Sequence, residues 1–207
     1  PLSSALNLDP ITPSVITDPT VIYPDYAVKD NQGRYYGISS NVTNEMSNPL
    51  AYAKTQAGNY GYTDDFLGNV FAEFQPIKDL VFKSTLGGKL SYWGGENFSP
   101  RYYFNSSNFS TVNNKLSKES AKGFSWSIEN TLTYNKRFSD HNITLLLGQG
   151  YYVDNISNLI GFEMRNLPVN THAEASFNFP YTTETSDGWQ WQATEHKTSS
   201  IFGRLIY

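Results

Sequence analysis

Cysteine is absent from the 207-residue sequence, and so are long apolar runs. Without cysteine there is no disulfide framework and no thiolate-based metal site. No stretch of about 18 consecutive apolar residues occurs, which excludes a transmembrane helix. Any crossing of a membrane would therefore have to be made by strands.

Charge of either sign is sparse. The chain carries 15 Lys and Arg against 19 Asp and Glu, which gives a net charge of −4 at pH 7. The basic residues are scattered along the sequence, whereas a nucleic-acid-binding surface depends on clustered Lys and Arg. Nucleic acid is therefore not an expected partner.

Aromatic residues, by contrast, are abundant. Tyr occurs 15 times and Phe 13 times, and aromatics make up 15% of the chain. The hydrophobic fraction is only 39% and the mean hydropathy is −0.47, values that fit a soluble chain. A membrane β-barrel has the same profile, because only alternate residues of its strands face lipid.

A period of two in the apolar residues runs through five segments. The expected strands cover residues 66–76, 80–93, 122–135, 141–153 and 197–207. Successive side chains of a strand point to opposite faces, so each segment has one apolar and one polar face. The segments are longer than the roughly 5–6 residues usual in a soluble sandwich. They suit strands that cross a bilayer at a tilt, which need about 9–11 residues.

The two faces of these strands have different expected environments. In a barrel wall, the expected lipid-facing side chains are Leu80, Phe82, Leu86, Leu90, Trp126, Ile128 and Leu132. The expected lumen-facing side chains are Lys83, Thr85, Lys89, Ser127, Glu129 and Thr131. Trp93 and Trp126 lie near strand ends, where a membrane barrel carries its aromatic girdles.

The connections between the strands alternate in length. Those near 76–79 and 136–141 are short, whereas 94–121 and 154–196 are long, polar and aromatic, and residues 1–65 form a long loop region. Short periplasmic turns and long extracellular loops are typical of bacterial outer-membrane barrels. We therefore expect an all-β fold: a segment of an antiparallel up-and-down transmembrane β-barrel with long extracellular loops.

Several stretches of the sequence resemble one known family. They are PLSSALNLDPITP, YGISSNVTNEMSNPLAYAKTQ, FLGNVFAEFQPIKDLVFKSTLGGKLSYW, GFSWSIENTLTYNKRFSDHNITLLLGQGYY and SSIFGRLIY. They are similar to SusC-like TonB-dependent transporters of the outer membrane of Bacteroidetes. The resemblance implies a barrel of about 22 strands. In the family such stretches lie inside a longer polypeptide, so this chain is expected to be a mid-barrel segment.

The same resemblance implies a function and partners. Members of the family import nutrients such as oligosaccharides or peptides across the bacterial outer membrane. Their partners are a SusD-like surface lipoprotein, which acts as a lid, and the TonB energy-coupling complex, which acts on a plug inside the barrel. Neither a plug nor a TonB box matches this sequence. The expected neighbours of this segment are thus the remainder of the barrel, the plug, the lid and outer-membrane lipid.

Residue clusters suited to covalent chemistry are scarce. His141, His172 and His196 are far apart and lack the spacing of metal ligands. Asp64 and Asp65 could bind Ca²⁺, but solvation of a loop end is the simpler interpretation. No nucleophile–base–acid order can be argued. We expect no catalytic residue, no metal and no cofactor, and a protein that is not an enzyme.

The aromatic-rich loops are the best candidates for ligand binding. RYYFNSSNF supplies Tyr102, Tyr103 and Asn105, and DGWQWQATEH supplies Trp189 and Trp191. Aromatic faces with nearby amides suit the recognition of sugars or peptides. The alternative is that these aromatics pack loop against loop or against a lid protein. A second function class also stays open, that of a free-standing carbohydrate-binding or adhesin domain.

Overall fold

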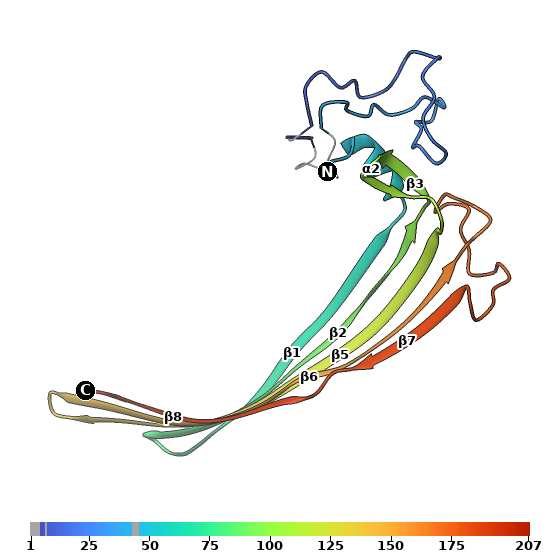
Figure 1. Ribbon diagram of the computed structural model, residues 1–207. Coiled ribbons are helices and arrows are strands. Elements are labelled where there is room, and N and C mark those ends of the chain that lie inside the picture. The colour runs from blue at the N-terminus through green and yellow to red at the C-terminus, as the bar shows by residue number, and fades with distance from the viewer. Residues whose placement is uncertain (1–4, 7, 43–45) are drawn as a thin grey trace. The chain divides into compact units, whose positions relative to one another are not determined.

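Strands dominate the computed structural model, which describes residues 5–6, 8–42 and 46–207. In chain order its elements are α2 (Pro49–Thr55), β1 (Tyr60–Ile77), β2 (Leu80–Ser99), β3 (Tyr102–Asn105), β4 (Asn108–Ser110), β5 (Lys115–Phe138), β6 (His141–Arg165), β7 (Ser186–Gln192) and β8 (His196–Ile206). One sheet has the order β1-β2-β5-β6-β7, with β8 also paired to β6 (Figure 1). Strands β3 and β4 form a separate two-stranded sheet. The expected all-β class is confirmed.

The chain divides into two compact units, and each is described by itself. We call Pro1–Gly61, Gly95–Glu119 and Gly161–Trp189 the loop unit. We call Tyr62–Gly94, Ser120–Ile160 and Gln190–Tyr207 the sheet unit. Within the described part of the chain, no helix has the length and apolar content needed to cross a membrane.

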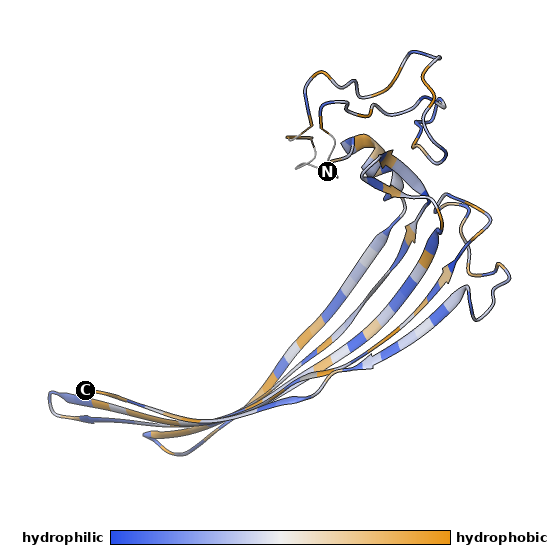
Figure 2. Cartoon of the chain, viewed as in Figure 1, coloured by the Kyte–Doolittle hydropathy of each residue, from blue (hydrophilic) through white to orange (hydrophobic). Residues whose placement is uncertain are grey.

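The sheet unit keeps the expected alternation of faces. Strands β6 and β8 pair antiparallel, with Leu145 opposite Leu205 and Leu146 opposite Arg204. Residues directly opposite each other share a face of the sheet, so Leu145, Leu147 and Leu205 lie on one face, and Arg204 lies on the other together with Leu146. Figure 2 shows hydrophobic and hydrophilic residues interspersed along these strands.

Very short turns join the long strands of the sheet unit in pairs. Only Lys78 and Asp79 separate β1 from β2, and only Ser139 and Asp140 separate β5 from β6. Ser139 adopts a positive φ of 50°, which a tight turn demands and a small polar residue tolerates. The Asp79 carbonyl accepts from the Asn135 backbone N–H at 2.8 Å, which ties the first turn to β5. The sequence predicted short turns at both places.

The strands extend beyond the apolar alternation, which corrects the expected boundaries. Strand β1 begins at Tyr60 rather than 66, β2 ends at Ser99 rather than 93, β5 begins at Lys115 rather than 122, and β6 ends at Arg165 rather than 153. Ladder hydrogen bonds join backbone groups and need no apolar side chain. Polar extensions such as KLSKES can therefore continue a strand although no alternation of apolar residues reveals them in the sequence.

Short elements also occur inside the expected loops. The region 1–65 contains α2, although residues 1–4, 7 and 43–45 lie outside the described part. The loop expected at 94–121 contains β3 and β4, and the one expected at 154–196 contains β7. The helix was missed because it is only seven residues long, too short for an amphipathic period to show.

The loop unit has a small apolar core of its own. Phe98, Leu116, Met164 and Leu167 are all at most 3% exposed, and residues of the loop after β6 pack against them. Asn114, fully buried, donates to the Leu167 carbonyl at 3.1 Å and accepts from the Leu167 backbone N–H at 2.7 Å. This core and this buried amide hold the 166–179 loop in place, and with it the residues that line the cavity described next.

Candidate functional site

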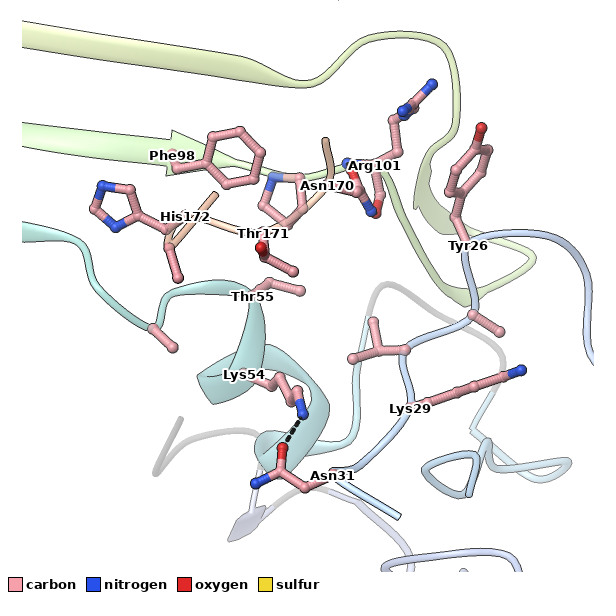
Figure 3. A pocket seen from close by; sticks show the side chains of 15 residues that line it. Tyr26, Lys29, Asn31, Lys54, Thr55, Phe98, Arg101, Asn170, Thr171 and His172 are labelled. Carbon is pink, nitrogen blue, oxygen red and sulfur yellow. Dashed lines mark hydrogen bonds between the residues drawn. The ribbon is translucent and has the colours of Figure 1, made fainter. Parts of the chain in front are cut away.

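A cavity of about 560 Å³ opens in the loop unit and is lined by four separate segments. These are 26–31, the end of α2, the end of β2 with the two residues that follow it, and 170–173 (Figure 3). The side chains that carry its chemistry are Tyr26, Lys29, Asn31, Lys54, Phe98, Arg101, Asn170 and His172. The volume is within the usual range of small-molecule sites, roughly 300–1,000 Å³.

A tight hairpin presents the first of these side chains. The Asp30 carboxylate accepts from the backbone N–H groups of Gln32 at 2.8 Å and Arg34 at 2.9 Å, and it forms an ion pair with the Arg34 guanidinium at 2.7 Å. Gly33 has φ +80°, a conformation that favours glycine. Because Asp30 closes the turn, its neighbours Lys29 and Asn31 are fixed at the edge of the cavity.

Electrostatics keep Asp30 ionised. Partial desolvation raises the pKa of its carboxyl, but the hydrogen bonds from Arg34 and Gln32 and the Arg34 charge outweigh that effect and hold the pKa below its usual 3.8. The Asp30 charge is thus committed to Arg34 and is not available to neutralise its neighbour Lys29.

Helix α2 presents the next cation. Asn48 is its N-cap and accepts from the Leu50 backbone N–H at 3.0 Å, and Pro49 follows at the first helical position, where a missing N–H costs nothing. The Asn48 side chain also donates to the carbonyls of Ser14 at 3.0 Å and Gly37 at 3.2 Å. The helix is therefore anchored at its start, and its last turn carries Lys54, which hydrogen-bonds Asn31 on the same side of the cavity (Figure 3).

Arg101 lines the cavity and is held in place through its backbone. The Arg101 N–H donates to Asn170 Oδ1 at 2.7 Å, and Asn170 Nδ2 donates back to the Arg101 carbonyl at 2.9 Å. The guanidinium lies over the Tyr26 ring, with 4.8 Å from Cζ to the ring centroid. Its buried Nε–H has no hydrogen-bond partner among the described residues. Burial of an unpaired donor is costly.

His172 closes another side of the cavity. Its ring stacks on Phe98, with 6.1 Å between ring centroids and 6° between planes, and Nε2 lies 3.2 Å from Glu96 Oε1. Gly58 is directly beneath it: a Cβ there would come within 2.3 Å of His172 Nδ1. The glycine, at φ +90°, thus allows the imidazole its position.

The charge around the cavity is positive. Lys29, Lys54 and Arg101 line it, and among the described residues no Asp or Glu does. None of the ion pairs in the described part of the chain involves these three cations. Cations beside apolar walls favour a ligand that carries an anionic oxygen group. In the residues that the structure describes, no cluster of His, Cys, Asp or Glu could hold a metal ion.

The sequence-predicted loop residues lie next to this cavity but do not line it. Tyr102 packs on Phe104 at 4.5 Å between ring centroids. The Tyr103 backbone N–H donates to the Tyr26 carbonyl at 2.8 Å and so supports that wall. Asn105 is only 5% exposed, and its side chain donates to the Met46 carbonyl and accepts from the Ser107 backbone N–H. The Asn105 side chain therefore joins two parts of the backbone through hydrogen bonds.

The two predicted tryptophans lie in different units. Trp189, in the loop unit, lies against Gly161, where a Cβ would come within 2.2 Å of the indole. Trp191, in the sheet unit, is 56% exposed and lines a hollow of about 300 Å³ together with Trp93. Trp93 shares this hollow with Lys89 and Ser91, so it lies on the polar face rather than in an outward girdle.

Sequence reasoning missed the cavity itself. Its lining residues come from turns and strand ends without any period, so no local pattern connects Lys29 with Lys54 or Arg101. The one available signal was the position of Arg101 directly before Tyr102 in RYYFNSSNF, because Arg beside aromatics is common in binding sites.

Comparisons with known proteins agree on the type of protein. No family model matches the sequence. TonB-dependent receptor P3 of Formosa agariphila is 28% identical over 128 residues, which are 62% of this chain and 12% of that protein. The RagAB peptide importer in its open-open state matches with a TM-score of 0.58, 20% identity and coverage of 83% of this chain and 18% of that chain. Another RagAB peptide transporter structure matches at 0.59 and 18% identity, again over 83% of this chain.

These matches differ in what they show about the chain. The chain spans only about an eighth to a fifth of the proteins that it matches. At 18–20% identity, the solved structures show that the fold is shared. The curated relative shows a sequence similarity to a TonB-dependent receptor. The chain is thus similar in sequence to a part of a TonB-dependent receptor and similar in fold to a part of the RagAB peptide importer.

Proposed function

We propose that the chain forms part of the wall and external loops of a TonB-dependent importer, which takes up oligosaccharides or peptides together with a SusD-like surface lipoprotein. The observation that carries the proposal is the set of long amphipathic strands in one antiparallel sheet, matched to a peptide importer at a TM-score of 0.58. Strands of this length with one apolar face suit a bilayer on one side and a wet lumen on the other.

The two units have different roles in this proposal. The apolar face of the sheet unit contacts lipid, and its polar face lines the lumen, where the plug lies. The loop unit faces the outside of the cell and the lid protein. Energy enters through the TonB complex, which acts on the plug and touches no residue of this chain. None of the residues here performs covalent chemistry.

The loop-unit cavity binds part of the nutrient. Its cations Lys29, Lys54 and Arg101 support a nutrient with a carboxylate, such as a peptide end, an acidic side chain or an acidic sugar. The aromatic walls formed by Tyr26 and Phe98 add apolar area to the contact. Binding at the outer end of the barrel precedes passage through the lumen.

Deletion of a loop tests the proposal. Removal of residues 168–183, between β6 and β7, takes away Asn170 and His172 and leaves both strands intact. We expect slower growth on the cognate nutrient while the transporter still inserts into the outer membrane, as judged by surface labelling and heat-modifiable migration. Normal growth of the deletion strain would contradict a role for this loop in uptake. Turnover of a glycan or peptide by the purified protein would overturn the transporter function itself.

A further inference from the structure

A second hollow lies on the polar face of the sheet unit. It has a volume of about 300 Å³ and is lined by residues of β2, β5, β6 and β7. Lys89, Ser91 and Trp93 are spaced by two along β2, so all three project from the same face. Ser125 of β5 and Trp191 of β7 also line the hollow. We call it the indole hollow.

The backbone is shaped to seat one of these indoles. A Cβ at Gly123 would come within 2.8 Å of Trp93 Cζ3 and within 3.1 Å of Cη2. Only a glycine therefore lets the six-membered ring of Trp93 lie on β5. Trp191 remains 56% exposed, which is unusual for so large an apolar side chain. Two indoles thus line one hollow, one seated on the sheet and one open.

The surroundings of the indoles are polar and nearly neutral in charge. Lys89 Nζ forms an ion pair with Asp65 Oδ2 at 3.1 Å, and Ser91 Oγ donates to Asp65 Oδ1 at 2.6 Å. The hydrogen bonds from Ser91 and Lys89 therefore fix this group of side chains beside the hollow. Ser125 and Asp154 add a hydroxyl and a carboxylate to the lining.

This combination suits a pyranose ring better than a peptide. A pyranose presents C–H groups on its faces and hydroxyls around its rim, and each hydroxyl both donates and accepts. Indole faces offer flat apolar area to the ring, while Ser, Lys and Asp side chains match the rim hydroxyls. A peptide strand would instead seek backbone partners at a sheet edge, and the hollow lies on the face of paired strands.

We propose that the indole hollow is a sugar-binding station on the lumen wall, at which a neutral pyranose unit of an oligosaccharide stacks on Trp93 and Trp191. This inference rests on the proposed importer function and deepens it, because it favours oligosaccharides over peptides as the cargo. Such a station holds the cargo weakly inside the pore after it leaves the external loops.

Matched tryptophan variants of the complete transporter test the station. Trp93→Ala and Trp191→Ala each remove an indole, and Trp191→Tyr keeps an aromatic face. The control is Trp126→Ala: Trp126 projects from the opposite face of β5 and packs on Tyr151 at 5.6 Å. Gly123→Ala is a further variant that retains every indole but displaces Trp93. Binding of the detergent-solubilised proteins is measured on an array of oligosaccharides and an array of peptides of similar size.

The expected result is binding to oligosaccharides that weakens about tenfold in Trp93→Ala and Trp191→Ala, a loss of roughly 1.4 kcal/mol. Gly123→Ala weakens binding as well, Trp191→Tyr restores most of it, and Trp126→Ala leaves it unchanged. Oligosaccharide binding that is equal in all variants overturns the station, and so does binding to peptides alone. If cells that carry these variants still take up a nutrient, the importer function stands, whether or not the sugar-binding station does. If the wild type takes up no nutrient, that result counts against the importer function.

Discussion

Arg101 is the residue on which the chemistry of the loop-unit cavity most depends. Its backbone groups hold Asn170, whereas its guanidinium rests on Tyr26 with a buried Nε–H that has no partner among the described residues. The side chain can therefore be changed without loss of the contacts that fix the loop. A guanidinium with its face on an aromatic ring still has its edge available for a carboxylate.

We predict that Arg101→Gln weakens binding of carboxylate-bearing ligands about tenfold or more, because a hydrogen bond to a charged group contributes about 1.5–3 kcal/mol. Peptides with free and with amidated C-termini, and acidic and neutral oligosaccharides, are compared by isothermal titration calorimetry. The control is Lys122→Gln, which removes one exposed cation of β5 outside the cavity. Equal losses for charged and neutral ligands would show that Arg101 does not recognise an anion.

A pH dependence is expected of the hairpin that carries Lys29. The pKa of Asp30 lies below its usual 3.8 in the folded state, so its bonds to Gln32 and Arg34 stabilise the turn above pH 3.8. That stabilisation is lost as the pH falls through the lowered pKa. Exchange of the Gln32 and Arg34 amides, corrected for intrinsic rates, should accelerate in that acidic window and not near pH 7. Asp30→Asn keeps an acceptor but cannot ionise, so its corrected exchange should not vary with pH; a matching pH profile in both proteins would refute this assignment.

At the scale of the element, the alternation of apolar and polar side chains explains why the strands form, and backbone hydrogen bonds to neighbouring strands decide where they end. Along β6 and β8, Leu145, Leu147 and Leu205 lie on one face, and the other face mixes Arg204 and Ser200 with Leu146 and Phe202. One exception on the first face is the amide pair Asn130–Gln149, in which Asn130 Nδ2 donates to Gln149 Oε1 at 3.0 Å. Each amide thus satisfies part of the hydrogen-bonding capacity of the other, which lowers the free-energy cost of placing two polar groups on an apolar surface.

Strand β5 offers a direct test of which face meets lipid. Ile128→Arg places a charge on the proposed lipid face and should cost about 2–4 kcal/mol of folding free energy near the middle of the bilayer. Thr131→Arg, three residues along the same strand and on the opposite face, should cost much less because the lumen is wet. Refolding of the two variants into lipid vesicles, titrated with urea, measures the difference. Equal costs would contradict the proposed orientation.

At the scale of the whole molecule, the sheet leaves edges and faces that need covering. All residues of β1 and of β8 are exposed, and apolar side chains such as Phe66, Val70 and Phe74 lie open on β1. A barrel of the outer membrane needs at least about eight strands to close. Unpaired backbone groups at an edge are costly in lipid and lead to aggregation in water.

We therefore predict that residues 1–207 expressed alone, without detergent, do not form a stable monomer. In the membrane, β1 and β8 would pair with strands of the remaining barrel. Size-exclusion chromatography and amide exchange of the isolated chain check this: aggregation or rapid exchange along β1 is the expected result. A monodisperse soluble monomer with protected edge strands would refute both this prediction and the membrane assignment of the faces.

The sequence by itself determined the fold class and the long strands, because a period of two that lasts for ten or more residues matches the geometry of a strand and not that of a helix. It also determined the short turns, which Pro76 and the polar stretch at 139–142 mark. Its resemblance to SusC-like transporters predicted a TonB-dependent transporter, and the comparisons find a TonB-dependent receptor and a peptide importer among similar proteins.

Only the tertiary structure decided where strands end and which side chains meet. Polar strand ends such as 115–121 pair through backbone groups that carry no sequence signal. Lys29, Lys54 and Arg101 come together because an Asp30 turn, a capped helix and an Asn170 amide each fix one segment of chain. Trp93 and Trp191 line one hollow although they come from different strands, and Gly123 leaves room for Trp93 on β5. Such contacts join residues that lie tens of positions apart, and local periodicity contains no information about them.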